Sequence, residues 1–349
     1  MSLSAGAGRF RGAYTAAMSF DPNAKAGAES GIYGLETGPD AAAAHILPVP
    51  FDATASYGKG AADGPAAVLR ASRQVDLLDL VGGSPWRRGI WMAPIDARVQ
   101  GWNALAAEAA AEGDTARVNA IMEELNAWVE ERTEEALARG KLVATLGGDH
   151  SAPFGAIAAH ARAHPGMGIL HVDAHADLRA AYEGYTWSHA SIFHNVAELD
   201  LVANIVQIGV RDLCDEELAA IRGSGGRLRT LFDHEWAAAR LAGQDLIALV
   251  RRTLEPLPKD VYVSFDVDGL DPTLCPGTGT PVPGGFLWHE AMLWLSELSL
   301  SGRRIVGLDL TEVAPGTPGA GGDSWDAVVG ARLLYRMLGF ALRTRPEAA

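Results

Sequence analysis

The sequence predicts an α/β protein built around a mainly parallel sheet. Short apolar runs that look like buried strands recur along the second half of the chain, and helical segments of a dozen or so residues separate them. This alternation is typical of βαβ units. In such sheets ligands bind beyond the carboxyl ends of the strands, so the residues that follow each strand are the candidates for a functional site.

The N-terminal part of the chain is less regular. Residues 1–40 are rich in Ala, Gly and Ser without clear periodicity, so we expect an N-terminal extension that is mobile or packs on a neighbouring subunit. One α/β domain is expected over residues 41–349. Its first strand is predicted at residues 44–50, followed by a glycine-rich loop and a helix that begins near Pro65. The glycine spacing of this loop fits neither familiar nucleotide-binding pattern, so we expect no nucleotide there.

A long helix is predicted between Thr115 and Gly140. Asp114 or Thr115 is the expected cap, and Gly140 is the expected stop. Apolar residues recur between them at helical spacing, namely Val118, Ile121, Met122, Leu125, Trp128, Val129 and Leu137. We interpret this stripe as part of the core and expect no chemistry from it.

The remaining strands and helices alternate. Strands are expected over residues 141–148, 166–173, 204–210, 260–267 and 303–310. Helices are expected from about Pro153, near Glu216 and near His289. The order of these elements is what predicts a parallel sheet.

Composition narrows the classes of function. The chain has 349 residues, of which 48% are hydrophobic and 21% charged, as in ordinary globular proteins. Its 29 basic and 43 acidic residues give a formal net charge of -14, which argues against nucleic acid or an anionic membrane as a partner and suits a cationic ligand. Cys214 and Cys275 are its only cysteines, so a cytoplasmic location is expected. Neither secretion nor membrane spanning is expected.

Acidic residues and histidines gather where four of the predicted strands end. In chain order they are His150, then Asp173, His175 and Asp177, then Asp266 and Asp268, and finally Glu312. Side chains alternate faces in an extended chain, so residues two apart are expected to point the same way. The strand ends are therefore predicted to bring these side chains together.

Such a cluster needs cations. Four crowded aspartates would repel and would raise one another's pKa values, whereas two divalent ions supply four compensating charges. Mixed carboxylate and imidazole ligands favour manganese, nickel, iron or zinc over calcium or magnesium. Any one of these acids is equally well explained as a helix cap or turn residue, but three motifs at successive strand ends favour a metal site.

The motifs GGDHS, DAHADLR and SFDVDGLDP, followed by PGTGTPVPGG and the segment around Glu312, resemble those of the ureohydrolases. This family comprises arginases, agmatinases, guanidinobutyrases and guanidine hydrolases, and the resemblance covers roughly residues 44–340. It implies a three-layer α/β/α arginase-like fold with a central, mostly parallel sheet, which makes residues 41–349 a catalytic domain. It also implies two divalent metal ions per chain, Mn²⁺ or Ni²⁺, and assembly as a homo-oligomer, either a trimer or a hexamer.

The resemblance also implies roles for individual residues. One ion would be held by His150, Asp173, Asp177 and Asp266, and the other by Asp173, His175, Asp266 and Asp268. A metal-bridging hydroxide would attack the guanidinium carbon and release urea plus ammonia or an amine. Glu312 matches the glutamate that contacts the guanidinium, Asp177 is expected to protonate the leaving amine, and His189 resembles the histidine that shuttles protons to solvent. His194 is the nearby competitor for the role of His189.

Other candidate residues are interpreted as structural. His160 and His164 lie four residues apart, which is also a metal-ligand spacing, but Arg162 and the surrounding alanines indicate a solvent-facing side of a helix. Cys275 has no His or Asp companion in the sequence that would make it a nucleophile. The glycines after it are interpreted as a loop that shapes the wall of the pocket.

The substrate is less well determined. Arginases have a carboxylate-binding Asn where this chain has Arg179 and an acid where it has Cys214, so L-arginine is disfavoured. The stretch DLRAAYEGYTWSHAS resembles the guanidine hydrolase branch and its alkylguanidine-cleaving relatives, so guanidine or an alkylguanidine is the favoured substrate. Trp187 and nearby rings would contact the guanidinium through cation-π interactions or would pack the loop. Agmatine and 4-guanidinobutyrate, whose carboxylate Arg179 would hold, are the alternatives.

Two hypotheses of other classes stay open. The chain could be an accessory subunit that keeps the fold and the metals but serves as a scaffold in a mixed oligomer with a related subunit. It could also be a one-metal amide hydrolase related to the deacetylases, in which case His150, Asp177 and Asp268 would lack the roles given above.

Overall fold

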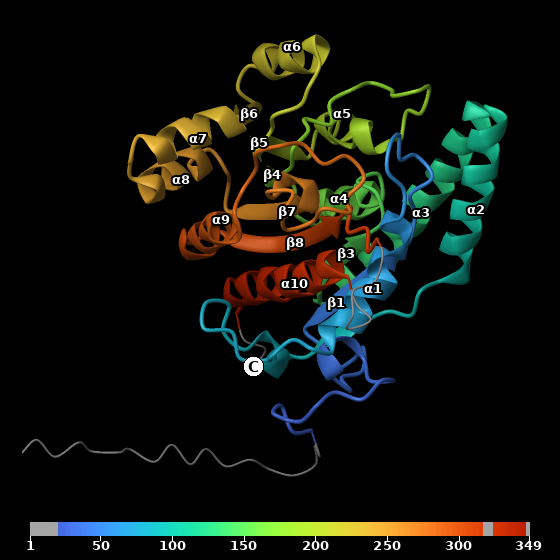
Figure 1. Ribbon diagram of the computed structural model, residues 1–349, viewed down its shortest axis with the longest axis vertical. Coiled ribbons are helices and arrows are strands. Elements are labelled where there is room, and N and C mark those ends of the chain that lie inside the picture. Colours follow the sequence, from blue (N-terminus) through green and yellow to red (C-terminus); the bar gives the residue numbers. More distant parts are fainter. Residues whose placement is uncertain (1–19, 317–323, 347–349) are drawn as a thin grey trace, which may run out of the picture.

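A single parallel sheet forms the centre of the computed structural model, which describes residues 20–316 and 324–346 (Figure 1). The sheet has eight strands in the order β2-β1-β3-β8-β7-β4-β5-β6, and every neighbouring pair is parallel. The strands are β1 (Ala44–Val49), β2 (Ile90–Met92), β3 (Leu142–Gly147), β4 (Met167–Val172), β5 (Val202–Ile208), β6 (Leu228–Leu231), β7 (Asp260–Asp266) and β8 (Arg304–Thr311). The predicted mainly parallel sheet is confirmed.

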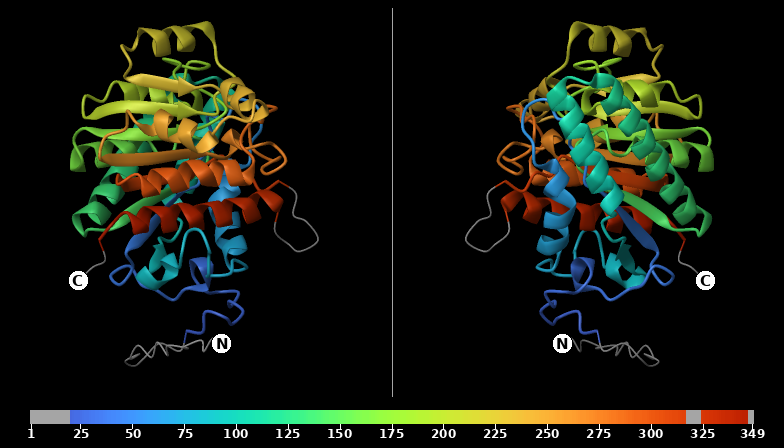
Figure 2. Two further views of the ribbon diagram at one scale, coloured as in Figure 1. Left: turned by 90° about the vertical axis from the view of Figure 1, so that its left-hand side faces the viewer. Right: turned by 90° about the vertical axis from the view of Figure 1, so that its right-hand side faces the viewer.

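Helices cover both faces of the sheet and give three layers, as the two side views show (Figure 2). One face carries α1 (Gly64–Ser72), α7 (Asp233–Leu241), α8 (Leu246–Leu254), α9 (Trp288–Leu300) and α10 (Trp325–Arg343). The other carries α2 (Ala97–Glu112), α3 (Thr115–Ala138), α4 (Phe154–Ala163) and α5 (Ile192–Ala197), while α6 (Asp215–Gly223) follows β5. The three-layer α/β/α prediction is confirmed.

Local sequence signals explain where the long helix α3 begins and ends. The Asp114 side chain accepts a hydrogen bond from the backbone N–H of Arg117, and Gly140, at φ 71°, ends the segment in a left-handed conformation. Its neighbour α4 approaches closely, because a Cβ atom at Gly155 would overlap the Asn126 carbonyl oxygen of α3. Helices α3 and α4 therefore pack together beside β3, the strand that precedes His150.

The segment before β1 is described from Phe20 onward, and residues 1–19 of the expected extension lie outside the described residues. Ile32, Tyr33 and Leu35 are buried in the core on the α1 and α10 side. The Tyr33 hydroxyl donates a hydrogen bond to the Ala331 carbonyl of α10 at 3.1 Å. This part of the segment therefore packs against the chain's own domain.

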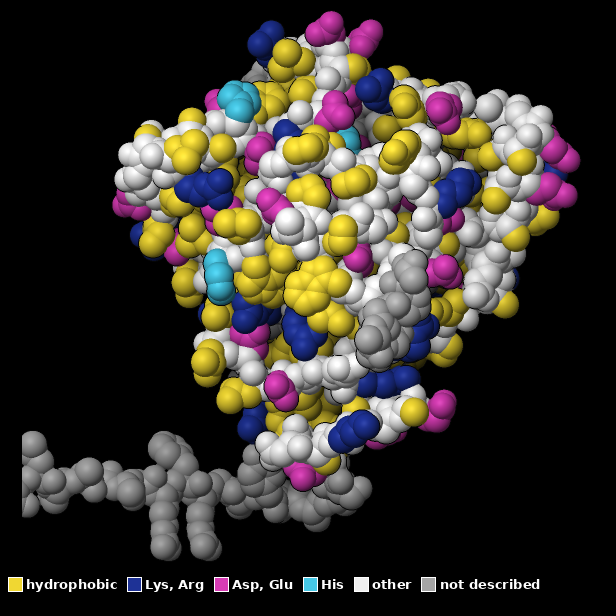
Figure 3. All heavy atoms as spheres, in the orientation of Figure 1, with side chains coloured by type: hydrophobic (Ala, Val, Ile, Leu, Met, Phe, Trp, Pro, Cys, Tyr) yellow, Lys and Arg dark blue, Asp and Glu magenta, His cyan; other side chains and the backbone are white. Residues whose placement is uncertain are grey.

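The surface of the described chain mixes charge types. On the face seen in Figure 3, acidic and basic side chains are interspersed with apolar ones over the helices. Among the described residues, no helix combines the length and the apolar character that crossing a bilayer requires.

The prediction that His160 faces solvent is wrong. His160 is fully buried between α4 and the sheet, where its ring packs edge-on against Tyr262. Its Nδ1 donates to the Ala156 carbonyl at 2.7 Å, whereas its Nε2 is buried and has no hydrogen-bond partner among the described residues. Gly307 of β8 provides the space, because a Cβ atom there would overlap the His160 ring. His164 is half-buried beside Asp260 and Arg304.

Burial of His160 is expected to make folding sensitive to acid. Burial lowers the pKa of His160 to about 4, so the folded chain excludes a proton that the unfolded chain binds below its ordinary pKa of about 6.5. The neutral, buried ring therefore lowers the unfolding free energy only in acid: its full value holds above pH 6.5, and it decreases as the pH falls towards 4. Replacing His160 with glutamine should therefore reduce the loss of unfolding free energy over that range, by about 3 kcal/mol at most. Urea denaturation of both proteins at pH 7 and pH 4.5 measures it, and equal losses would contradict the prediction.

Candidate metal centre

Four neighbouring strands deliver the candidate residues to one edge of the sheet. The strands β3, β8, β7 and β4 lie side by side, and because they are parallel their carboxyl ends meet. His150 follows β3 after a short turn, Glu312 comes directly after β8, Asp266 ends β7 and Asp173 directly follows β4. The strand order therefore determines which side chains become neighbours.

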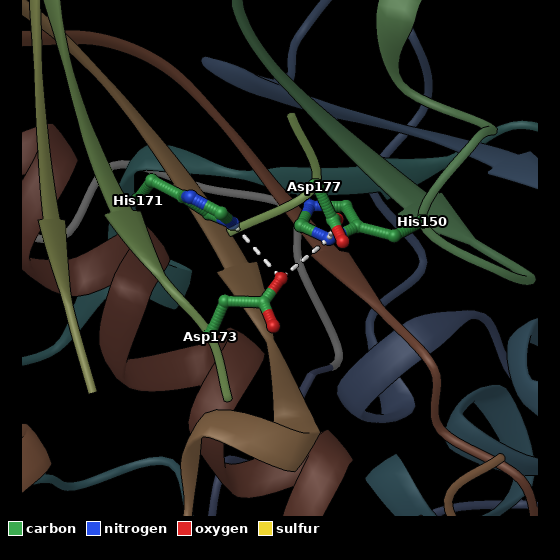
Figure 4. Close-up of side chains that lie close together, drawn as sticks. All are labelled: His150, His171, Asp173 and Asp177. Atoms are coloured by element: carbon green, nitrogen blue, oxygen red, sulfur yellow. Dashed lines mark hydrogen bonds and ion pairs between the residues drawn. The ribbon is translucent and has the colours of Figure 1, made fainter. Parts of the chain in front are cut away.

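The structure brings all six predicted metal ligands into one network. His150 Nδ1 lies 2.9 Å from Asp173 Oδ2, 3.1 Å from Asp177 Oδ2 and 3.3 Å from Asp266 Oδ2. His175 Nδ1 lies 3.0 Å from Asp268 Oδ2 and 3.4 Å from Asp173 Oδ1. Asp173 lies near both His150 and His175, as expected for a carboxylate that bridges two metal ions. Figure 4 shows its carboxylate between the rings of His150 and His171.

The cause predicted for this convergence, alternation along an extended strand, is wrong. β4 ends at Val172, and Asp177 has a left-handed backbone with φ 55°. Asp268 lies in a 3₁₀ turn, η5 (Val267–Gly269), whose backbone N–H at Asp268 donates to Asp266 Oδ1 at 2.8 Å. Turns with specific hydrogen bonds therefore orient the carboxylates, and strand alternation does not.

Burial makes this cluster electrostatically demanding. Burial and the charge of Asp173 raise the pKa of Asp177 to about 7, and burial together with Asp268 and Asp173 raises the pKa of Asp266 well above its usual value. Burial also raises the pKa of Asp173, but hydrogen bonds from His150 and His171 more than offset this and lower it well below the usual value. Bound cations would relieve the mutual repulsion of these buried carboxylates. Imidazole nitrogens and carboxylate oxygens in two overlapping groups fit a binuclear metal site.

Glu312 lies beside the cluster in a strained turn. Its backbone has φ 61°, which bulky residues rarely adopt, and its N–H donates to the Gly148 carbonyl at 2.8 Å. Its Oε1 accepts a hydrogen bond from the backbone N–H of His150 at 2.9 Å. Gly279, in the loop predicted to shape the pocket wall, lies close to the second carboxylate oxygen, Glu312 Oε2. A Cβ atom at Gly279 would be only 3.3 Å from that oxygen. The turn thus aims a buried carboxylate along the edge of the candidate metal site.

His189 is positioned by the glycine-rich loop after β1, a contact that no motif in the sequence indicates. Its Nε2 lies 3.3 Å from Ser56 Oγ, and its backbone N–H donates to Thr54 Oγ1 at 3.3 Å. Thr54 in turn donates to the buried carboxylate of Asp149, next to His150, at 2.7 Å. Burial lowers the pKa of His189 to about 4, so the ring is neutral near neutral pH. Its competitor His194 contacts the site through its backbone N–H, which donates to the Asp177 carbonyl.

The aromatic residues of this loop divide into two groups. Trp187 packs on Phe154 with ring centroids 4.8 Å apart, and Tyr185 is buried in the same core cluster, which favours a packing role for both. Tyr182 instead lies edge-on to His189 at 6.1 Å, and the guanidinium of Arg179 lies 5.0 Å above its ring. Tyr182 therefore links the guanidinium of Arg179 to the ring of His189.

His171 is a buried member of the cluster that the sequence analysis missed. Its Nε2 lies 2.9 Å from Asp173 Oδ2, and it groups with His150, Asp173 and Asp177 (Figure 4). The signal in the sequence was a histidine inside an apolar strand, two residues before Asp173.

Cys275 is buried, and burial raises the pKa of its thiol well above the usual value, which suits the structural role expected for it.

Comparison with known proteins identifies this combination of fold and cluster. A sequence model of the arginase family matches residues 42–339. The chain belongs to the arginase family. It is accordingly a metal-dependent ureohydrolase, a hydrolase that acts on linear amidines.

Individual relatives of this arginase-family chain are agmatinase-type enzymes. The N(1)-aminopropylagmatine ureohydrolase of Thermus thermophilus is 34% identical over 297 residues, which cover 84% of this chain and 88% of that protein. The guanidinobutyrase of Pseudomonas aeruginosa is 32% identical over 303 residues, which cover 86% of each. The solved structure of agmatine ureohydrolase from Thermoplasma volcanium matches the fold with a TM-score of 0.68 at 23% identity, covering 88% of this chain and 92% of that one.

Proposed function

We propose that this chain is a binuclear-metal amidinohydrolase that releases urea from an alkylguanidine with a charged tail. The observation that carries this proposal is the position of Glu312, whose carboxylate touches the backbone of His150 at 2.9 Å and so borders the candidate metal ligands. A buried carboxylate at that edge is suited to hold a guanidinium cation against the metal site. The catalytic domain in this proposal is residues 41–349.

The ligands divide into two overlapping sets in this proposal. The first set is His150, Asp173, Asp177 and Asp266, and the second is Asp173, His175, Asp266 and Asp268. The distances from His150 Nδ1 and His175 Nδ1 to the shared carboxylate of Asp173 support this division. When bound, two divalent ions, Mn²⁺ or Ni²⁺, would activate the water that attacks the guanidinium carbon.

The other side chains would bind the substrate and move protons. Glu312 holds the guanidinium and balances its charge. Asp177, which lies 3.1 Å from His150 Nδ1, delivers a proton to the leaving nitrogen. His189, kept neutral by burial and half-open to solvent beside Ser56, transfers protons between the site and the outside.

The tail of the substrate is assigned from Arg179. Its guanidinium is partly exposed and lies over the ring of Tyr182, which in turn lies edge-on to His189, and Glu217 is 3.7 Å from Arg179 Nε. A cation at this position suits a carboxylate, so a guanidino acid such as 4-guanidinobutyrate is the favoured substrate. Agmatine, whose tail is an amine, is the second candidate, favoured by the net charge of -14 and by the agmatine-type relatives. Guanidine or a short alkylguanidine, bound beside Tyr182 or Trp187, is the third.

The experiment that tests this proposal is urea release by the purified chain, loaded separately with Mn²⁺ and Ni²⁺. The substrates are 4-guanidinobutyrate, agmatine, methylguanidine, guanidine and L-arginine. Urea from 4-guanidinobutyrate above the others would support the assignment of Arg179. Failure on every guanidine with two ions bound per chain would favour the accessory-subunit hypothesis, and one ion per chain would favour the deacetylase-like alternative.

Assembly belongs to the same proposal. We expect a homo-oligomer, a trimer or hexamer, or a mixed oligomer with a related subunit. Size-exclusion chromatography with light scattering, run on the same samples as the urea assay, measures the number of subunits. Turnover by the purified chain alone would make a second kind of subunit unnecessary.

Replacing Glu312 with glutamine should weaken substrate use without removing the metals. The amide oxygen keeps the hydrogen bond from the His150 backbone but loses the charge that opposes the guanidinium. A hydrogen bond to a charged group contributes about 1.5–3 kcal/mol, so kcat/KM should fall roughly 10- to 100-fold. Glu290, which pairs with Arg240 on the surface, gives the matched control Glu290→Gln. Unchanged kcat/KM in the Glu312 variant would remove this residue from the site.

A further inference from the structure

His171 lies between the candidate metal site and the interior of the sheet. It is fully buried in β4, and its ring stacks on Phe193 with centroids 3.7 Å apart and an interplanar angle of 21°. Both ring nitrogens have partners: Nε2 lies 2.9 Å from Asp173 Oδ2, and Nδ1 lies 3.0 Å from Gln207 Nε2. The ring is therefore held in one orientation.

The hydrogen bonds of Gln207 decide where the proton of His171 sits. The Gln207 amide nitrogen also donates to the Ala176 carbonyl at 2.8 Å, and its oxygen accepts from Thr230 Oγ1 at 3.0 Å. The NH₂ group must therefore face His171, so His171 Nδ1 is an acceptor. A neutral imidazole then carries its proton on Nε2, and this proton is donated to Asp173 Oδ2.

His150 has the opposite arrangement, with its outer nitrogen Nε2 as the donor. Ser264 Oγ donates to the buried carboxylate Oδ1 of Asp309 at 2.9 Å, which uses its single proton. Ser264 therefore accepts from His150 Nε2, 3.0 Å away, so Nδ1 is the nitrogen that gains a lone pair when His150 is neutral, as a metal ligand has to be. That nitrogen faces Asp173, Asp177 and Asp266. Of these two histidines beside Asp173 Oδ2, only His150 can offer a lone pair to a metal ion in the cluster.

We propose that His171 is a positioning residue that holds the shared carboxylate of Asp173 for two metal ions and is not itself a ligand. A nitrogen that carries a proton has no lone pair for a metal, so its place in the cluster reflects support of Asp173. Asp173 Oδ1 is fixed from the other side by the backbone N–H of His175 at 2.6 Å. Together the two donors set the plane of the carboxylate before any ion arrives. This inference rests on the proposed binuclear function.

The test measures Mn²⁺ affinity by titration calorimetry, with urea release as a second readout. His171→Phe keeps a ring to stack on Phe193 but removes the donor, and Mn²⁺ binding is expected to weaken about 10- to 100-fold while two ions still bind at saturation. His171→Gln puts an NH₂ donor near the position of Nε2, and we expect affinity within about threefold of the wild type. Wild-type affinity in the Phe variant would overturn the proposal. So would loss of one ion at saturation in both variants, since this is the result expected for a ligand.

The outcomes also separate this inference from the proposed function. A wild-type chain that binds neither Mn²⁺ nor Ni²⁺ would overturn both. A wild-type chain that binds two ions and releases urea, with His171→Phe identical to it, would overturn only the role of His171. Weaker Mn²⁺ binding in His171→Phe with recovery in His171→Gln supports the inference even for a chain that releases no urea from the chosen substrates.

Discussion

Replacing Asp173 with asparagine is expected to abolish most urea formation, with kcat/KM lowered at least about 100-fold, and to reduce the metal bound per chain. Asp173 is the carboxylate shared by the His150 and His175 groups, and an amide has one ligating oxygen and no charge. The loss should exceed the 10- to 100-fold cost of removing a residue that merely supports a ligand. Metal per chain is measured by atomic emission after loading with Mn²⁺, and urea is measured on the same samples.

A matched control comes from the motif DVDGLDP itself. Asp271, the third aspartate of that motif, closes a local turn by accepting hydrogen bonds from Thr273 and takes no part in the cluster. Asp271→Asn should therefore retain two ions per chain and nearly full activity. If Asp173→Asn keeps both ions and the wild-type rate, Asp173 is not a bridging ligand.

Replacing Gly148 with alanine is expected to destabilise the fold and the site together. A Cβ atom at Gly148 would overlap the Phe51 carbonyl oxygen and lie 2.6 Å from its carbon, and backbone cannot move aside as a flexible side chain can. The Gly148 carbonyl also accepts the N–H of Glu312. Overpacking of this kind costs about 1–3 kcal/mol or more, and displacement of His150 and Glu312 should lower activity further. Urea denaturation and the urea-release assay measure the two effects.

Another glycine provides the control for this substitution. Gly101 lies inside α2, and a Cβ atom there would meet no atom within 4 Å. Gly101→Ala should therefore stabilise the chain by about 0.5–1 kcal/mol, because alanine loses less backbone entropy in a helix. A Gly148→Ala protein as stable and active as the Gly101→Ala protein would show that the strand-end turn tolerates a side chain.

Six of the eight strands in the described sheet, and the edge that carries the site, could be predicted because both are local signals, whereas the short outer strands β2 and β6 were not predicted. Buried parallel strands are short continuous apolar runs, and the residues after them appear directly in the sequence, as with Glu312 after β8. The prediction failed where contacts decide the outcome. His160 was assigned to solvent from its alanine-rich surroundings, but the missing side chain at Gly307, far along the chain, makes room for its ring.

The supporting parts of the site could not be read from the sequence for the same reason. Ser56 contacts His189 across 133 positions, and Thr54 contacts Asp149 across 95. A serine or threonine in a glycine-rich loop gives no local sign of such a partner. The role of His171 likewise depends on Gln207, 36 residues away in the next strand. Ligands recur in recognisable motifs, whereas the residues that orient them are identified only by tertiary contacts.

The position of β8 has a consequence for how the chain acquires its shape. This last strand inserts between β3 and β7, so the middle of the sheet stays open until nearly the whole polypeptide has been synthesised. Until then β3 and β7 present unpaired edges that can pair with other chains, and Glu312 cannot reach His150, 162 positions earlier. Contacts of such long range slow folding. A ribosome-bound chain that ends before Arg304 would therefore be inactive and prone to aggregation.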